Sequence, residues 1–287
     1  MNTKFTLLAA LLMALSFAFG QTSSNKLTFE NGQIYEIISK ISSGFEQEAM
    51  GRKIEVLING TIYHSYEVVS VSPDSIRLLH KTNRITFLLD GMNQKMNFDS
   101  DIKKDLDSEM GKVMKNALQD TYSMLIDLKG HVLEVQTTVT KGKKSDASEM
   151  EIFKNLLTGF TASLESPKKG ESSVFRILPE QEIRKGFVWA ETNEKKKTSF
   201  AIADITENEI LISYKSEYPT ESKGNIMGMD TFTNLDNSET GKIVLNKNTG
   251  IMKTKNATTT ATGHVSVMGQ NLPIVSAANA ETRISIK

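Results

Sequence analysis

The sequence predicts an α+β protein in which a large, curved antiparallel β-sheet, an open half-barrel, packs against two amphipathic helices. Three observations predict this fold. Closely spaced strand-like runs of alternating apolar residues are separated by turn residues, with no helical crossovers that a parallel sheet would require. Two stretches instead repeat apolar residues at three- and four-residue steps, as one face of a helix does. Segments of the two halves of the chain also resemble each other, which suggests duplicated halves.

The first half of the chain, residues 21–165, is expected to be rich in strands. Asn59-Gly60, Pro73-Asp74 and Lys129-Gly130 have turn chemistry, because Gly adopts positive φ freely and Pro presets the first dihedral of a turn. The expected strands are residues 33–41, 54–58, 61–71, 76–81, 85–89, 121–127 and 131–140.

Two amphipathic helices are expected within this half. The first runs from Ile102 to Leu118, with Ser100 or Asp101 able to cap its first turn, and the second covers residues 147–164. Each has one apolar stripe, which must cover another element, most simply the sheet. The stripe residues that we select as candidate ligand-binding residues are Leu106, Met110, Met114, Leu118, Met150, Phe153, Leu157 and Phe160.

The second half, residues 166–287, returns to strands and is expected to form one continuous domain with the first. Residues 166–170 have linker composition, and Gly241, Gly250 and residues 270–273 are expected to interrupt the strands. Residues 66–71 and 76–81 align without gaps onto residues 200–205 and 210–215, at an offset of 134, which suggests a duplication. The expected strands are residues 187–192, 198–205, 209–217, 225–234, 242–245, 251–261, 263–268 and 277–286.

The N-terminus has the pattern of an export signal. Residues 1–20 combine Lys4, an apolar run and small residues before Gln21, where cleavage is expected. The alternative, a membrane anchor, would need ~20 apolar residues, and the run has only about 15. We therefore expect a soluble periplasmic or secreted protein, without a lipid anchor because the chain has no Cys.

Composition argues against several classes of function. The 34 basic and 34 acidic side chains balance, whereas nucleic-acid binding relies on clustered Lys and Arg. The absence of Cys excludes disulfides and thiolate chemistry, and no two His have the spacing of a zinc site. An acidic cluster at residues 99–107 fits the first turn of a helix better than a calcium loop. We therefore predict no metal, no cofactor and no catalytic residue.

The chain resembles an uncharacterised family of exported Gram-negative bacterial proteins, a domain of unknown function. The resemblance rests on the signal followed by residues 27–32, the strand and Gly turn at 124–135, the helix at 153–160, and residues 175–179 leading to Gly186-Phe187-Val188-Trp189. It covers most of the mature chain but implies no catalytic residue. The layout is also similar to the half-barrel of bacterial lipoprotein carriers, in which a curved sheet wraps helices around an apolar cavity.

Two functions from different classes fit these observations. The first is a non-enzymatic binding protein that holds a lipid-like or apolar molecule between the helices and the concave side of the sheet. The alternative is a structural or protein-interaction module of the cell envelope with no small-molecule ligand. An enzyme is the least favoured class. The Met-rich stripe of the first helix suits an adaptable apolar surface, but ordinary core filling is the favoured explanation.

Overall fold

The computed structural model describes residues 26–49, 52–91, 94–119, 121–138, 164, 166–226, 229–267 and 269–287. Most of them form strands, and two short helices, α2 (Lys103–Leu106) and α3 (Glu109–Gln119), lie between β4 and β5. The strands are β1 (Ile34–Ala49), β2 (Arg52–Val71), β3 (Ser75–Gly91), β4 (Gln94–Asp99), β5 (Thr121–Asp127), β6 (Val132–Thr138), β7 (Val188–Asn193), β8 (Lys196–Ile205), β9 (Glu209–Ile226), β10 (Met229–Asn246), β11 (Met252–Val267) and β12 (Gln270–Ile286).

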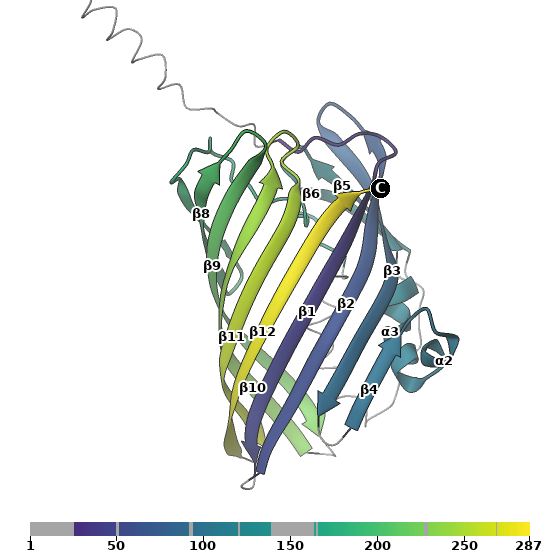
Figure 1. Ribbon diagram of the computed structural model, residues 1–287, viewed down its shortest axis with the longest axis vertical. Coiled ribbons are helices and arrows are strands. Elements are labelled where there is room, and N and C mark those ends of the chain that lie inside the picture. Colours follow the sequence, from purple (N-terminus) through teal and green to yellow (C-terminus); the bar gives the residue numbers. More distant parts are fainter. Residues whose placement is uncertain are drawn as a thin grey trace, which may run out of the picture.

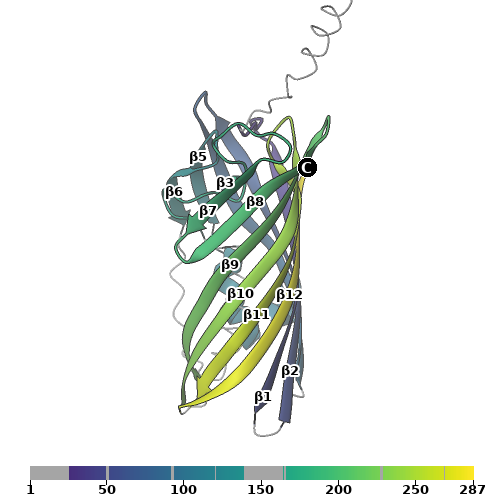
Figure 2. The ribbon, with the colours of Figure 1, turned by 90° about the vertical axis from the view of Figure 1, so that its left-hand side faces the viewer.

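These strands form one antiparallel 12-stranded sheet, in the order β6-β5-β3-β2-β1-β12-β11-β10-β9-β8-β7, with β4 added beside β3. The sheet is open, because β6 and β7 at its two ends do not pair with each other. The first and last strands, β1 and β12, pair near the middle and join the two halves (Figure 1). The long strands tilt and curve together, so that the sheet has a concave and a convex face (Figure 2). The predicted curved antiparallel sheet is therefore confirmed.

Alternation along the strands explains which face holds the core. In β5 every second residue is buried, and β3 alternates in the same way on both sides of a short irregularity. Because successive side chains of a strand point to opposite faces, this pattern puts one face of the sheet against packed atoms and leaves the other partly exposed.

Several strands are longer than the sequence predicts. The predicted turn at Asn59-Gly60 is wrong, because both residues lie inside β2, and the predicted breaks at Gly241 and before Gly263 lie inside β10 and β11. Close packing explains two of these glycines: a Cβ on Gly241 would lie 2.5 Å from the Tyr214 ring, and a Cβ on Gly263 would meet the backbone of β10. The predicted turns at Pro73-Asp74 and Lys129-Gly130 are confirmed.

The first predicted helix is interrupted. Ser108 separates α2 from α3 and caps α3, since its hydroxyl accepts the Gly111 N–H at 3.1 Å. Gly111 permits this break because a Cβ there would meet the Leu106 carbonyl oxygen. Ser100, a predicted cap, instead accepts the backbone N–H of Ile85 at 3.0 Å and extends the sheet. The second predicted helix lies outside the described residues except for Leu164, which is buried.

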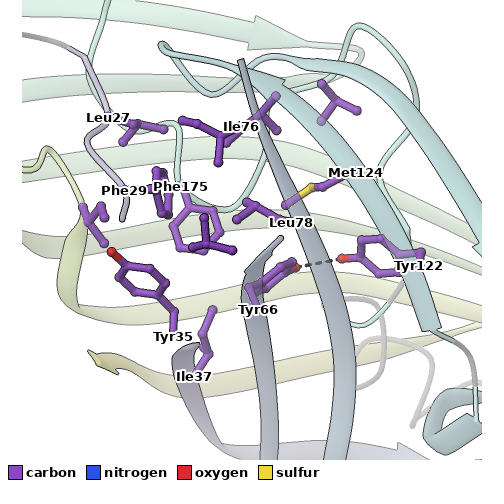
Figure 3. Packing of buried hydrophobic residues seen from close by; sticks show 14 residues of the cluster. Leu27, Phe29, Tyr35, Ile37, Tyr66, Ile76, Leu78, Tyr122, Met124 and Phe175 are labelled. Carbon is purple, nitrogen blue, oxygen red and sulfur yellow. Dashed lines mark hydrogen bonds between the residues drawn. The ribbon is translucent and has the colours of Figure 1, made fainter. Parts of the chain in front are cut away.

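Among the described residues, three apolar clusters hold the fold together. The first lies at one end of the concave face and includes residues of β1, β2, β3 and β5 around Phe175 (Figure 3). The second joins α3 and Leu164 to β1, β2, β3 and β4, so α3 packs on the sheet as the apolar stripe predicts. The third joins β7 through β11 with Leu178 and Ile183.

Residues 166–187, which we call the strap, connect the two ends of the sheet. The Gly170 N–H donates to the carbonyl of Val132 in β6 at 2.8 Å, and Arg176 pairs with Glu191 of β7 at 3.2 Å. Phe175 is fully buried between these attachments. The predicted linker composition at 166–170 thus belongs to a segment that packs on the sheet at both ends.

The two hairpins that align in sequence also correspond in structure. Each carries one extra residue in its first strand, Val69 in β2 and Ala203 in β8, at the same offset of 134. In the turns that follow, the backbone N–H groups of Ser72 and Thr206 each donate to the carbonyl three residues later, at 2.8 and 2.9 Å. This correspondence supports the suggested duplication, which stays a prediction.

Candidate ligand-binding cavity

One row of residues, each paired with the next on the neighbouring strand, crosses the centre of the concave face. The sizes of its side chains show where this face is hollow. Small residues occupy most of the middle of this row, whereas aromatic rings occupy both flanks. From β4 to β7, the row is Phe98, Phe87, Gly60, Ile41, Ala280, Ala257, Gly241, Tyr214, Phe200 and Trp189. Because Gly and Ala project little beyond the backbone, the middle of the concave face is hollow.

A cavity of about 1210 Å³ lies over this row. Its walls come from both halves of the chain, with segments of β1, β2, β3 and β4 on one side and of β9, β10, β11 and β12 on the other. Typical small-molecule sites measure roughly 300–1,000 Å³, so the volume is sufficient for a sizeable organic ligand.

The wall from the first half is apolar. Ile41, Phe87 and Phe98 border the cavity and belong to the cluster that α3 covers. In the rows on either side, Ile58 and Ile62 of β2 are also buried in this cluster. This wall offers a contact surface for hydrocarbon.

The wall from the second half includes Tyr214, and a charged cluster adjoins this residue on the same face of the sheet, next to the described residues that line the cavity. Glu239 of β10 is buried, and its Oε1 accepts the Tyr214 hydroxyl at 2.7 Å. Its Oε2 accepts Lys196 Nζ at 3.0 Å, and Lys255 Nζ lies 3.7 Å from Oε1. Both lysines also lie over aromatic rings, Lys196 over Tyr218 and Lys255 over Tyr214. We call Lys196, Tyr214, Tyr218, Glu239 and Lys255 the lysine cluster.

Electrostatics keep the carboxyl group of this cluster ionised. Burial raises the pKa of Glu239, but Lys255, Lys196 and the Tyr214 hydroxyl together lower it further, so that it lies below its ordinary value. Burial lowers the pKa of Lys255, and Glu239 opposes this effect. Burial and the neighbouring carboxylate raise the pKa of Tyr214, so the phenol stays protonated. The cluster contains two lysines and one glutamate, so it holds one more basic than acidic side chain.

Four of the predicted ligand-binding residues lie on α2 and α3, and the other four lie outside the described part of the chain. Met110 and Met114 are buried in the cluster under α3, and Leu118 packs on it, whereas Leu106 is 39% exposed. None of these four is among the described residues that line the cavity. The residues of the second predicted helix lie outside the described residues; they are Met150, Phe153, Leu157 and Phe160. Their roles in binding stay predictions.

Residues 74–252 match the model of DUF6263, a family of unknown function. The chain belongs to this family. The match begins in the turn before β3 and ends at the first residue of β11, so it includes the strands that carry Tyr214 and Glu239. No curated protein matches the sequence.

Several solved structures are similar to this DUF6263 chain at low sequence identity. Lipovitellin, from a structure that describes its lipid–protein interactions, is 9% identical with a TM-score of 0.48; the match covers 91% of this chain and 26% of lipovitellin. An outer membrane channel from Pseudomonas putida F1 is 8% identical, with a TM-score of 0.26 and coverage of 91% and 98%. The translocator domain of the autotransporter NalP from Neisseria meningitidis is 8% identical, with a TM-score of 0.22 and coverage of 98% and 95%. Similarity at this level identifies no function.

The structure of the DUF6263 chain also brings together two histidines that are separate in the sequence. His64 Nδ1 and His80 Nε2 lie 3.0 Å apart on β2 and β3, in a buried site with Tyr66 and Tyr122. Burial lowers the pKa of His64 to about 4; burial and His64 lower that of His80 to about 3. The two phenols share a hydrogen bond of 2.7 Å (Figure 3). The spacing of histidines along the sequence does not reveal this pair, because the two residues lie on neighbouring strands.

Two further features of the DUF6263 chain concern metals and membranes. Among the described residues, no group of three or more His, Asp or Glu side chains could hold a metal ion. Within the same part of the chain, neither α2 nor α3 has the length and apolar character needed to cross a membrane.

Proposed function

We propose that this protein is a non-enzymatic binding protein that holds an apolar or lipid-like molecule in the cavity on the concave face of its sheet. The observation that carries the proposal is the cavity itself, which lies where the residues of both halves are small and which has an apolar wall of Ile and Phe side chains. Filling it with hydrocarbon would remove apolar surface from water, at roughly 25 cal/mol per Å².

The pattern of β11 fits the same assignment. Successive outward positions of β11 are the exposed residues Thr258, Thr260 and Thr262, whereas the inward position Ala261 is buried. Along this strand, the apolar side chain therefore lies inside the curve. If residues 1–20 act as the predicted export signal, binding takes place in the periplasm or outside the cell.

The test uses the mature full-length protein and one cavity-filling variant. Ala280 borders the cavity at the centre of the row, so Ala280→Trp places a large ring in the space that the ligand needs. Ala277→Trp is the matched control, because Ala277 is an exposed residue on the same strand. Native mass spectrometry, extraction of bound lipids and titration with an environment-sensitive apolar dye measure binding, and circular dichroism checks folding.

We expect the wild type and Ala277→Trp to carry an extractable apolar ligand and to bind the dye, and we expect Ala280→Trp to lose both. If the wild type carries no ligand and binds no dye, the proposal is wrong, and the structural or protein-interaction role becomes the better explanation. Equal binding by all three proteins would place the ligand outside this cavity.

A further inference from the structure

The two walls of the cavity differ in chemistry, and this difference bears on the kind of ligand. The residues that the apolar wall contributes to the central row are Ile41, Gly60, Phe87 and Phe98. On the other wall, hydroxyl groups surround the lysine cluster on the same face of the sheet. In the two rows beside the central row, the hydroxyl residues of this wall are Thr282, Thr259, Ser216 and Thr198.

Within the lysine cluster, Tyr214 and Lys196 donate hydrogen bonds to Glu239, whereas Lys255 lies farther away. Glu239 uses one oxygen for Tyr214 at 2.7 Å and the other for Lys196 at 3.0 Å. Lys255 lies 3.7 Å from the carboxylate, beyond hydrogen-bond distance, and its side chain is 36% exposed, at a position next to Ala257 on the cavity floor. Its ammonium group has three donors and needs acceptors.

An anion is the ligand group that satisfies this arrangement best. Two ammonium groups lie within 3.0 and 3.7 Å of a single carboxylate, so one positive charge is left over. A partly buried, uncompensated charge is costly, and an added anion would compensate it with charge-assisted hydrogen bonds. A cationic ligand group would instead compete with two lysines for one carboxylate whose oxygens are already used.

We infer that the cavity binds an amphiphile whose anionic head group contacts Lys255 and Lys196, and whose apolar chain lies against the wall formed by β1, β2, β3 and β4. This inference rests on the proposed function and adds the ligand class and its orientation. A carboxylate and a phosphate have the same charge-assisted chemistry here, so the shared feature is an anionic head on a long hydrocarbon chain.

The test compares ligands that differ only in the head group. Binding to the delipidated full-length mature protein is measured for hexadecanoate, hexadecanol, hexadecylamine and inorganic phosphate by isothermal titration calorimetry, with displacement of an apolar dye as a second readout. We expect hexadecanoate to bind about tenfold or more tightly than hexadecanol, since hydrogen bonds to charged groups contribute about 1.5–3 kcal/mol and 1.4 kcal/mol corresponds to a factor of ten. Inorganic phosphate is expected not to displace the dye.

Two variants and one control assign the effect to the lysine cluster. Lys255→Met should weaken hexadecanoate binding about tenfold and leave hexadecanol binding unchanged. Lys253→Met is the control, because Lys253 lies on the same strand, is exposed and pairs with Glu209. Glu239→Gln removes the competing carboxylate and should tighten hexadecanoate binding, which keeps the test decisive if Lys255→Met does not fold.

The outcomes separate this inference from the proposed function. If hexadecanol binds as tightly as hexadecanoate, or hexadecylamine binds more tightly, the cavity still binds apolar chains but the anionic head group is wrong. Equal losses in Lys255→Met and Lys253→Met, or weaker hexadecanoate binding by Glu239→Gln, would also overturn it. Displacement of the dye by inorganic phosphate would identify a free anion as the ligand. If no long-chain compound binds, the proposed function itself fails.

Discussion

We predict that this protein loses stability at mildly acidic pH, because it buries the histidine pair His64 and His80. His64 and His80 are 3% and 0% exposed, and protonating either one would place a charge in a site formed with Tyr66 and Tyr122. These phenols cannot compensate it, because burial raises the pKa of Tyr122 to about 12 and raises that of Tyr66 well above its ordinary value. The perturbation that tests the prediction is the double substitution His64→Leu with His80→Phe.

The sign and size follow from the pKa values. The folded-state pKa is about 4 for His64 and about 3 for His80, both below the ordinary value of 6.5. The unfolded chain therefore binds more protons, so the stability from neutral burial is fully present well above pH 6.5 and is lost as pH falls toward the folded-state pKa values. Between pH 8 and pH 5 the loss is about 2 kcal/mol for each histidine, or roughly 4 kcal/mol for the pair.

Urea unfolding at a series of pH values from 8 to 5 measures the effect, because the slope of the unfolding free energy against pH counts the protons that unfolding takes up. In the wild type, we expect the unfolding free energy to fall as the pH falls from 8 to 5. The same slope is expected in His264→Gln, a change on β11 outside this site. A much smaller slope is expected in the double variant. The reasoning is refuted if the wild type shows no slope in this range, or if the double variant keeps it.

Three further predictions concern stability. Phe175→Ala should cost about 3–5 kcal/mol of unfolding free energy, because the ring is fully buried among strap and sheet residues; a loss below about 1 kcal/mol in urea titrations would show that the strap is not part of the cooperative core. Ser108→Ala should cost about 1 kcal/mol and Ser108→Gly only a few tenths, since Ser108 caps α3; equal costs would contradict the cap. Gly241→Ala should lower stability by about 1–3 kcal/mol, because its Cβ would lie 2.3 Å from the Asn256 oxygen; an unchanged thermal midpoint would show that β10 and β11 can separate there.

Features that depend on residues close together along the chain could be predicted from the sequence. Pro73 and Gly130 form turns because their own backbone preferences favour them. Met110 and Met114 pack on the sheet because helical periodicity puts them on one stripe. The same local reasoning failed at Gly60 and Gly241, which lie inside long strands. At Gly241, a Cβ would meet the Tyr214 ring of the neighbouring strand.

The candidate site itself was invisible to local reasoning. Tyr214, Glu239 and Lys255 lie on three strands, and only the register of β9, β10 and β11 brings them together. His64 pairs with Thr82 and His80 with Tyr66, so the two histidines meet diagonally beside an irregularity in the pairing of β2 and β3 that no spacing rule predicts. A strand shifted by one residue would turn each of these side chains to the opposite face.

The sequence by itself determined that the chain forms an antiparallel sheet with a helix packed on it, because alternation, helical periodicity and turn chemistry act over a few residues. Only the tertiary structure decided how long the strands are, which residues pair, and where the concave face is left hollow. Those properties depend on contacts between residues far apart in the chain, such as Ile41 with Ala280 and Lys196 with Glu239. The cavity and its lysine cluster therefore follow from the register of the whole sheet.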